Sequence, residues 1–128
     1  MNRIVLDASA LLAVLNREPG AEKLTPQLLN NATTSTVNLA EVQGKLVNRG
    51  LKPQEAWEAT ISPIREATAF TREHAMTAGS LIAETRALGL SLGDRACLAL
   101  GLELRAPVYT ADKSWKSLRL RLRIHVIR

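Results

Sequence analysis

The apolar and polar positions of this 128-residue chain switch repeatedly between the period of a strand and that of a helix. Residues 4–6 form a short apolar run, and from Ala8 onward apolar side chains recur at helical spacing until Pro19 and Gly20. This pattern predicts a strand over 4–6 and a helix that begins right after Asp7. Ligands of a parallel α/β sheet bind at such strand-to-helix junctions, so Asp7 is the first candidate for chemistry.

The remainder of the chain continues this alternation. We expect helices over residues 21–30, 37–48, 53–62, 72–88 and 92–104, and strands over 32–35, 64–70 and 107–109. Thr36 and Ser91 are expected to be N-caps, and the helix over 92–104 is apolar almost all round, as in a buried helix. Strict alternation of leucine and arginine predicts a half-buried edge strand over 118–126. The chain is therefore expected to form a single α/β domain with a mainly parallel central sheet of about five short strands flanked by helices.

Composition narrows the class of protein. No apolar run approaches the roughly 20 residues of a membrane span, and the first residues lack the pattern of a secretory signal. The single cysteine, Cys97, excludes an internal disulfide and is expected in the core. We therefore expect a cytoplasmic protein.

The net charge of +5 is concentrated at one end of the chain. From residue 113 onward there are basic residues and no acid, whereas the preceding part is close to neutral. A basic segment of this kind favours contact with phosphates, although a charged, solvated strand edge explains it nearly as well. Aromatic residues make up only 3% of the chain, which disfavours a surface that stacks bases.

Four carboxylates stand where a parallel sheet would gather them. Asp7, Asp94 and Asp112 lie at or just beyond predicted junctions, and each has a structural explanation as a helix cap. Glu41 lies too far into its helix to be a cap, and its structural explanation is an ion pair with Lys45, four residues on. Asn38 lies one turn before Glu41 on the same face.

Converging carboxylates repel each other unless a cation or a proton neutralises them. Mg²⁺ and Mn²⁺ prefer carboxylate oxygen, whereas zinc is disfavoured here because His74 and His125 are isolated in the sequence. A metal held by acids beside a basic surface suits phosphodiester hydrolysis by a metal-activated water.

Four segments of the chain also resemble a known family: residues 4–12, 35–41, 90–100, and 109–112 with Trp115. The family is that of the PIN-domain ribonucleases, and the resemblance is closest to the VapC-type toxins of bacterial toxin–antitoxin pairs. The resemblance covers essentially the whole chain and implies one PIN-like (Rossmann-like) three-layer domain over 1–128. It implies a Mg²⁺- or Mn²⁺-dependent endoribonuclease that acts on RNA, forms a homodimer and is inhibited by a cognate VapB-like antitoxin.

The resemblance also assigns roles to individual residues. It implies catalytic, metal-binding acids at Asp7, Glu41, Asp94 and Asp112, of which Asp7 and Asp94 are the strongest candidates. Polar supporting positions fall on Ser9, Asn38 and Thr110. Arg95, beside Asp94, is equally compatible with a scissile phosphate or a structural ion pair. The candidate RNA contacts of the basic segment are Lys113, Lys116, Arg119, Arg121 and Arg123, although the connection to the last strand is usually less basic in this family.

Two other classes of function stay open at this point. One is a non-catalytic module of the same fold that binds RNA or an antitoxin, which the presence of all four acids disfavours. The other is a phospho-receiver domain, which is disfavoured because Asp7 is followed by Ala8 and Ser9 rather than by a second acid, and because the strand over 64–70 ends without an aspartate. Trp57 is expected to serve in packing or in a protein interface.

Overall fold

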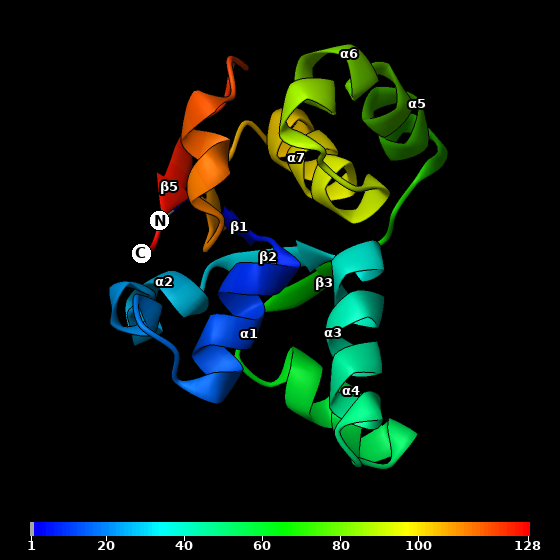
Figure 1. The fold of residues 1–128 in the computed structure, drawn as a ribbon. Helices are drawn as coiled ribbons and strands as arrows, with labels where there is room; N and C mark the ends of the chain where they lie inside the picture. The colour runs from blue at the N-terminus through cyan, green and yellow to red at the C-terminus, as the bar shows by residue number, and fades with distance from the viewer. Residues whose placement is uncertain (1) are drawn as a thin grey trace.

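A five-stranded parallel sheet is the centre of the fold (Figure 1), and the computed structural model describes residues 2–128. The strand order is β3-β2-β1-β4-β5, and every pair of neighbours is parallel. The strands are β1 (Ile4–Leu6), β2 (Ala32–Ser35), β3 (Glu66–Thr68), β4 (Val108–Thr110) and β5 (Ile124–Val126). The predicted single α/β domain with a parallel sheet is confirmed.

Helices cover both faces of the sheet, as Figure 1 shows. The α-helices are α1 (Ala8–Asn16), α2 (Pro26–Leu29), α3 (Thr36–Asn48), α4 (Pro53–Ile61), α5 (Arg72–Ser80), α6 (Ile82–Thr85) and α7 (Leu92–Leu104). Three 3₁₀ turns complete the fold: η1 (Ala21–Lys23), η2 (Arg86–Leu88) and η3 (Lys113–Ser117). No helix within residues 2–128 is both long and apolar enough to cross a bilayer.

Strand β1 separates two hydrophobic cores because successive side chains of a strand point to opposite faces. Ile4 and Leu6 pack with apolar residues of α1, α3 and α4. Val5 packs on the other side, with α7 and with Trp115 of η3. The strand is buried on both faces, as is typical of a central parallel strand.

Two predicted helices are interrupted in the structure. The helix over 21–30 is instead η1 and α2, because Thr25 caps a new helix at Leu28 N and Pro26 occupies its first position. The helix over 72–88 is divided at Leu81 into α5, α6 and η2. Near this division the hydroxyls of Ser80 and Thr85 donate to carbonyls four residues earlier, a contact that bends helices. The caps also differ by one residue: Ser35, not Thr36, caps α3, whereas Ser91 caps α7 as predicted.

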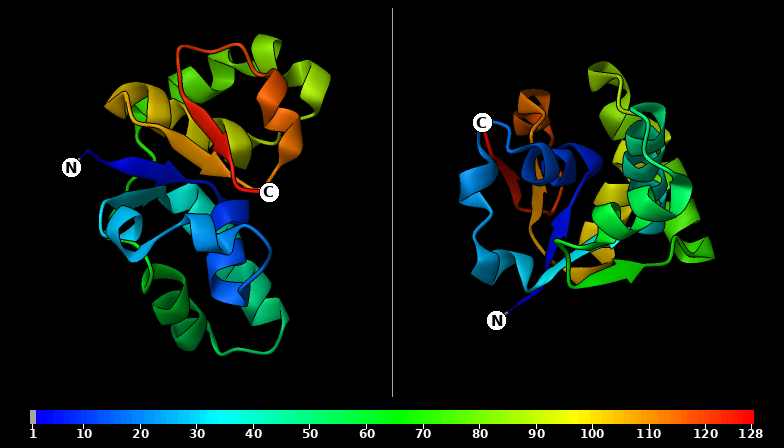
Figure 2. Two further views of the ribbon diagram at one scale, coloured as in Figure 1. Left: turned by 90° about the vertical axis from the view of Figure 1, so that its left-hand side faces the viewer. Right: turned by 90° about the horizontal axis from the view of Figure 1, so that it is seen from below.

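The C-terminal segment differs most from its prediction. Only Ile124–Val126 form a strand, so the prediction of a strand over 118–126 is wrong for residues 118–123. The alternation nevertheless persists in burial, because Leu118, Leu120 and Leu122 pack against the core around α7 while the intervening arginines are exposed. In the left view of Figure 2 this link runs back from η3 (orange) to the start of β5 (red).

Candidate active site

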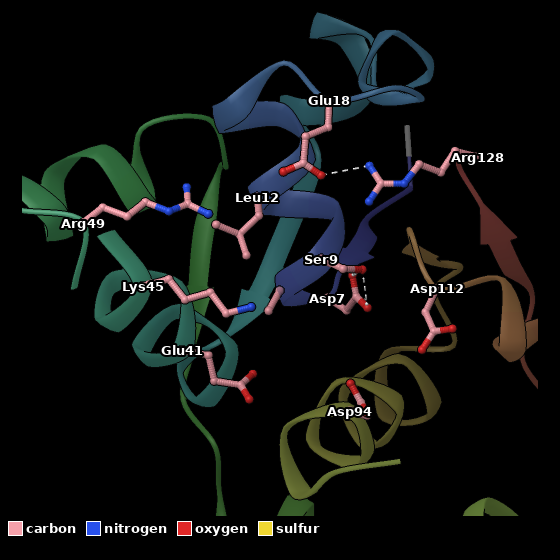
Figure 3. A pocket seen from close by; sticks show the side chains of 11 residues that line it. Asp7, Ser9, Leu12, Glu18, Glu41, Lys45, Arg49, Asp94, Asp112 and Arg128 are labelled. Carbon is pink, nitrogen blue, oxygen red and sulfur yellow. Dashed lines mark hydrogen bonds and ion pairs between the residues drawn. The ribbon is translucent and has the colours of Figure 1, made fainter. Parts of the chain in front are cut away.

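The four predicted acids line one cavity of about 350 Å³ at the carboxyl edge of the sheet (Figure 3). They come from four parts of the chain: Asp7 follows β1, Glu41 lies on α3, Asp94 lies in the first turn of α7, and Asp112 follows β4. Because the strands are parallel, their carboxyl ends share one edge, and the topology brings these positions together.

Asp7 is the buried member of this group, with 3% of its surface exposed. Its Oδ1 accepts hydrogen bonds from Ala10 N (2.8 Å) and Ser9 Oγ (2.8 Å), and its Oδ2 accepts one from Thr110 Oγ1 (2.6 Å). Burial raises the pKa of Asp7 to about 6; the three hydrogen bonds lower it only in part, and the charge of Asp94 raises it further.

Ser9 and Thr110 hold Asp7 between two elements. Ser9 Oγ accepts from Ala111 N (2.9 Å), and Thr110 Oγ1 accepts from Asp112 N (3.0 Å). The two hydroxyl oxygens lie 3.2 Å apart. They therefore connect the start of α1 to the end of β4 and fix the orientation of the carboxylate.

Asn38 connects Glu41 to α7. Its Nδ2 donates to Glu41 Oε1 (2.9 Å) and to the carbonyl oxygen of Gly93 (3.0 Å), and it is almost completely buried. The predicted pairing of amide and carboxylate on one helix face is therefore present. The alternative explanation of Glu41, an ion pair with Lys45, is not: no such pair forms among the described residues.

Asp94 and Asp112 are caps and cavity residues at once. Asp94 Oδ2 accepts from Ser91 N (2.9 Å), which completes the capping box of α7. Asp112 Oδ1 accepts from Ser114 N (2.9 Å) and Ser114 Oγ (2.7 Å) at the start of η3. The structural and functional explanations of these acids are thus compatible, since one carboxylate oxygen caps and the side chain still lines the cavity.

Cys97 lies close enough to the acids of the cavity for their negative charges to affect its thiol. Burial raises the pKa of its thiol well above the usual value, and the charges of Asp7, Asp94 and Glu41 add to this effect. The thiol therefore stays protonated and serves the core, as expected.

The predicted RNA-contact residues do not line this cavity. Arg95 is turned toward α5, where its Nη1 donates to the carbonyl oxygen of Ala78 (2.8 Å). The side chains of the basic segment lie exposed on η3 and the following link: Lys113, Lys116, Arg119, Arg121 and Arg123.

Sequence reasoning missed the cations that do line the cavity, namely Lys45, Arg49 and Arg128. Arg128 Nη1 reaches Glu18 Oε1 at 2.9 Å (Figure 3), and hydrogen bonds from Asn16 and from this arginine hold the pKa of Glu18 below its usual value. Lys45 shares a helix face with Glu41 and was detectable by that spacing. No local signal identifies Arg128, because its position depends on how β5 docks.

The donor set has the chemistry of a site for a hard divalent cation. All four candidate ligands are carboxylates, and Asp7 lies close enough to Asp94 for their charges to interact. Within residues 2–128, however, no three His, Cys, Asp or Glu side chains have the spacing of a complete metal site. This arrangement fits Mg²⁺, which keeps several waters and commonly takes only one or two carboxylates.

The fold and the cavity together define a parallel α/β domain with an acidic site at its carboxyl edge. The family model described as PIN domain matches residues 4–119, so the chain belongs to the PIN-domain family. This membership removes the phospho-receiver alternative.

Solved structures share the fold at low sequence identity. VapBC from Salmonella typhimurium, solved bound to DNA, has a TM-score of 0.77 at 16% identity and covers 100% of both chains. VapBC2 from Rickettsia felis, bound to a promoter DNA fragment, has a TM-score of 0.76 at 19% identity over 98% of each chain. VapC20 from Mycobacterium tuberculosis, a toxin that cleaves the sarcin–ricin loop, has a TM-score of 0.73 at 19% identity over 94% of this chain and 98% of that one. No curated protein matches the chain.

Proposed function

We propose that this PIN domain is a divalent-metal-dependent endoribonuclease and the toxin of a toxin–antitoxin pair. The observation that supports it most directly is the convergence of Asp7, Glu41, Asp94 and Asp112 on one cavity. The structural neighbours of the chain include a toxin that cleaves the sarcin–ricin loop and members of toxin–antitoxin systems.

In this proposal Asp7 and Asp94 hold Mg²⁺ or Mn²⁺, and Glu41 and Asp112 bind a second ion or act through water. A bound divalent ion would lower the pKa of a water molecule and neutralise charge that develops on the phosphate. Ser9 and Thr110 orient Asp7 through the hydrogen bonds described above, and Asn38 orients Glu41. Lys45, which forms no ion pair among the described residues, adds positive charge where a phosphodiester would enter, whereas Arg128 is already paired with Glu18.

The expected partners are an RNA substrate, a VapB-like antitoxin and a second copy of the chain, all within the cytoplasm. Large apolar side chains are exposed on the helices α5, α6 and α7, at Met76, Ile82 and Leu92. In this proposal these side chains contribute to the interface of the homodimer.

The test is cleavage of RNA by the purified protein in Mg²⁺ or Mn²⁺. Asp7→Asn and Asp94→Asn should each abolish cleavage and growth inhibition while the fold is retained, and a chelator should stop the parent. Glu73→Gln is the matched control, because Glu73 is an exposed acid in the first turn of α5, as Asp94 is in the first turn of α7. Cleavage by purified Asp7→Asn at the parent rate would contradict the proposal, and RNA binding without any cleavage by the parent would favour the non-catalytic module.

A further inference from the structure

A second cavity, of about 820 Å³, lies at the opposite edge of the sheet. Its position follows from the strands: Pro107 directly precedes β4, Asn2 lies just before β1, and Arg105 ends α7. We call it the arginine cavity because three arginines line it and no acid does: Arg105, Arg121 and Arg123.

The three guanidinium groups have no counter-charge. Within residues 2–128, none of them forms a side-chain hydrogen bond or an ion pair. By contrast, Arg3 pairs with Glu66 and Arg128 pairs with Glu18. Gathered like charges without a partner repel each other, so this cavity would gain from an anion.

The backbone beneath these arginines is held in place. Arg105 is the C-cap of α7, and its N–H bonds to the helix carbonyls of Gly101 and Leu102. The carbonyl of Arg123 accepts from Val108 N at 2.9 Å, which fixes the start of β5 against β4. The intervening Leu122 packs into the core, so the arginines on either side of it are presented to solvent.

An exposed basic segment joins the arginine cavity to the acidic one. It begins directly after Asp112, which lines the acidic cavity, and ends at Arg123, which lines the other. Between these ends Lys113, Lys116 and Arg119 are exposed. Pro107 and Asp112, on the two cavities, lie on either side of β4, so at the rise of a strand the cavities are roughly 16 Å apart.

We propose that an RNA strand bound at the acidic cavity follows this basic segment and places phosphates in the arginine cavity. The inference rests on the proposed function and extends it to the length of RNA that is bound. Guanidinium groups suit phosphate oxygens because their planar donors bind in pairs. No aromatic side chain lines the cavity, so the contact is to the backbone and carries no sequence preference. Continuity with the proposed phosphodiester site favours RNA over an acidic peptide as the occupant.

The test is RNA binding measured without cleavage, in an Asp7→Asn background, with labelled single strands of about 2 nucleotides, too short to reach from one cavity to the other, and of about 16 nucleotides. The test variant carries Arg105→Gln, Arg121→Gln and Arg123→Gln. The control carries Arg65→Gln, Arg72→Gln and Arg86→Gln, which removes the same charge from exposed positions elsewhere, none of which lines either cavity. The thermal midpoint of each protein shows whether the variant is folded. A double variant, Arg121→Gln with Arg123→Gln, tests the contacts without changing Arg105 at the end of α7.

For the longer RNA, the test variant should bind about tenfold more weakly than the control variant, and its salt dependence should fall by about 2 in log–log slope, as for three phosphate contacts. The short RNA should bind both variants equally. The inference would be overturned if the test variant lost affinity equally for both RNAs, or if the test and control variants behaved alike. It would also be overturned if the test variant kept its RNA binding but lost binding to a poly-glutamate peptide, measured in the same way. In each of these cases the proposed function would still stand. If the Asp7→Asn protein binds neither RNA, the proposed function fails as well.

Discussion

Asp7 is the residue at which stability and function conflict. A buried carboxylate is costly to ionise, and the pKa of about 6 for Asp7 reflects burial that outweighs its three hydrogen bonds. A protein selected for stability alone would place a neutral side chain here. The retained acid agrees with a role that needs negative charge at this point.

This conflict predicts the pH dependence of stability. Between about pH 4 and pH 6 the folded protein keeps a proton on Asp7 that the unfolded chain has released, so the free energy of unfolding falls as pH rises through this window. Asp7→Asn removes the effect, so the free energy of unfolding of this variant relative to the parent should rise by about 2 kcal/mol from pH 4 to pH 7. The measurement is urea unfolding of both proteins in a chelator, where all other groups titrate alike. If the free energy of unfolding changed with pH in the same way for both proteins, the ionisation of Asp7 would not destabilise the fold.

Gly93 gives a second prediction at the residue scale. A Cβ at this position would overlap the carboxylate of Glu41, whose exposed side chain can move aside only by giving up its hydrogen bond from Asn38. Gly93→Ala should therefore leave the thermal midpoint unchanged or higher, since alanine favours a helix, while it displaces Glu41 and lowers RNA cleavage by about 10- to 100-fold.

Gly79→Ala is the matched control for this change, because it lies in α5 with nothing near its Cβ position. It should keep full cleavage activity. If Gly93→Ala also kept full activity, the position of Glu41 would not matter for the reaction.

At the scale of elements, sequence patterns predicted most of the helices and strands but not the places where they break. Polar caps and prolines predicted the ends of α3, α4 and α7 closely, because those signals act within a few residues. The division at Leu81 was missed because serine and threonine also occur within continuous helices, so Ser80 and Thr85 are no reliable signal of a break. The irregular backbone of 118–123 was missed because it depends on packing. In residues 118–123, leucines at period two are partly buried without any strand pairing.

One turn should be critical for the C-terminal strand. Gly20 has a φ of +93°, and a Cβ there would overlap the backbone carbonyl of Ile127 at the end of β5. Gly20→Ala should therefore lower the free energy of unfolding by more than about 2 kcal/mol, since it combines backbone strain with a clash against main chain that cannot easily move. Gly50→Ala has the same kind of strain, with a φ of +113° and open space around it, and should cost only about 1 kcal/mol. Equal losses in denaturant unfolding would show that the contact with β5 adds nothing.

At the scale of the whole molecule, topology decides which parts of the site could be predicted. Asp7, Asp94 and Asp112 follow strand ends or begin helices, and a parallel sheet gathers such positions at one edge whatever the details of packing. Arg128 and the arginine cavity could not be predicted, because a terminal residue and a link without regular structure are placed only by tertiary contacts.

Metal binding and stability should be coupled through this geometry. A divalent ion would favour the ionised form of Asp7 and so offset the cost of burying it. A ligand that binds only the native state stabilises it, by about 2.7 kcal/mol at a hundred times its Kd. For a chain of this length that corresponds to a rise of about 10 °C in thermal midpoint. The parent should show this rise with saturating Mn²⁺ at pH 7.5.

Three comparisons in the same thermal unfolding assay would locate the ion. Asp7→Asn and Asp94→Asn should lose most of the rise, whereas Glu73→Gln should keep it. The parent should also need more Mn²⁺ at pH 5.5 than at pH 7.5, because below about pH 6 the ion competes with a proton on Asp7. No rise in the parent at millimolar Mn²⁺ would remove the metal from the proposed mechanism. A rise that Asp7→Asn retained would place the ion elsewhere in the molecule.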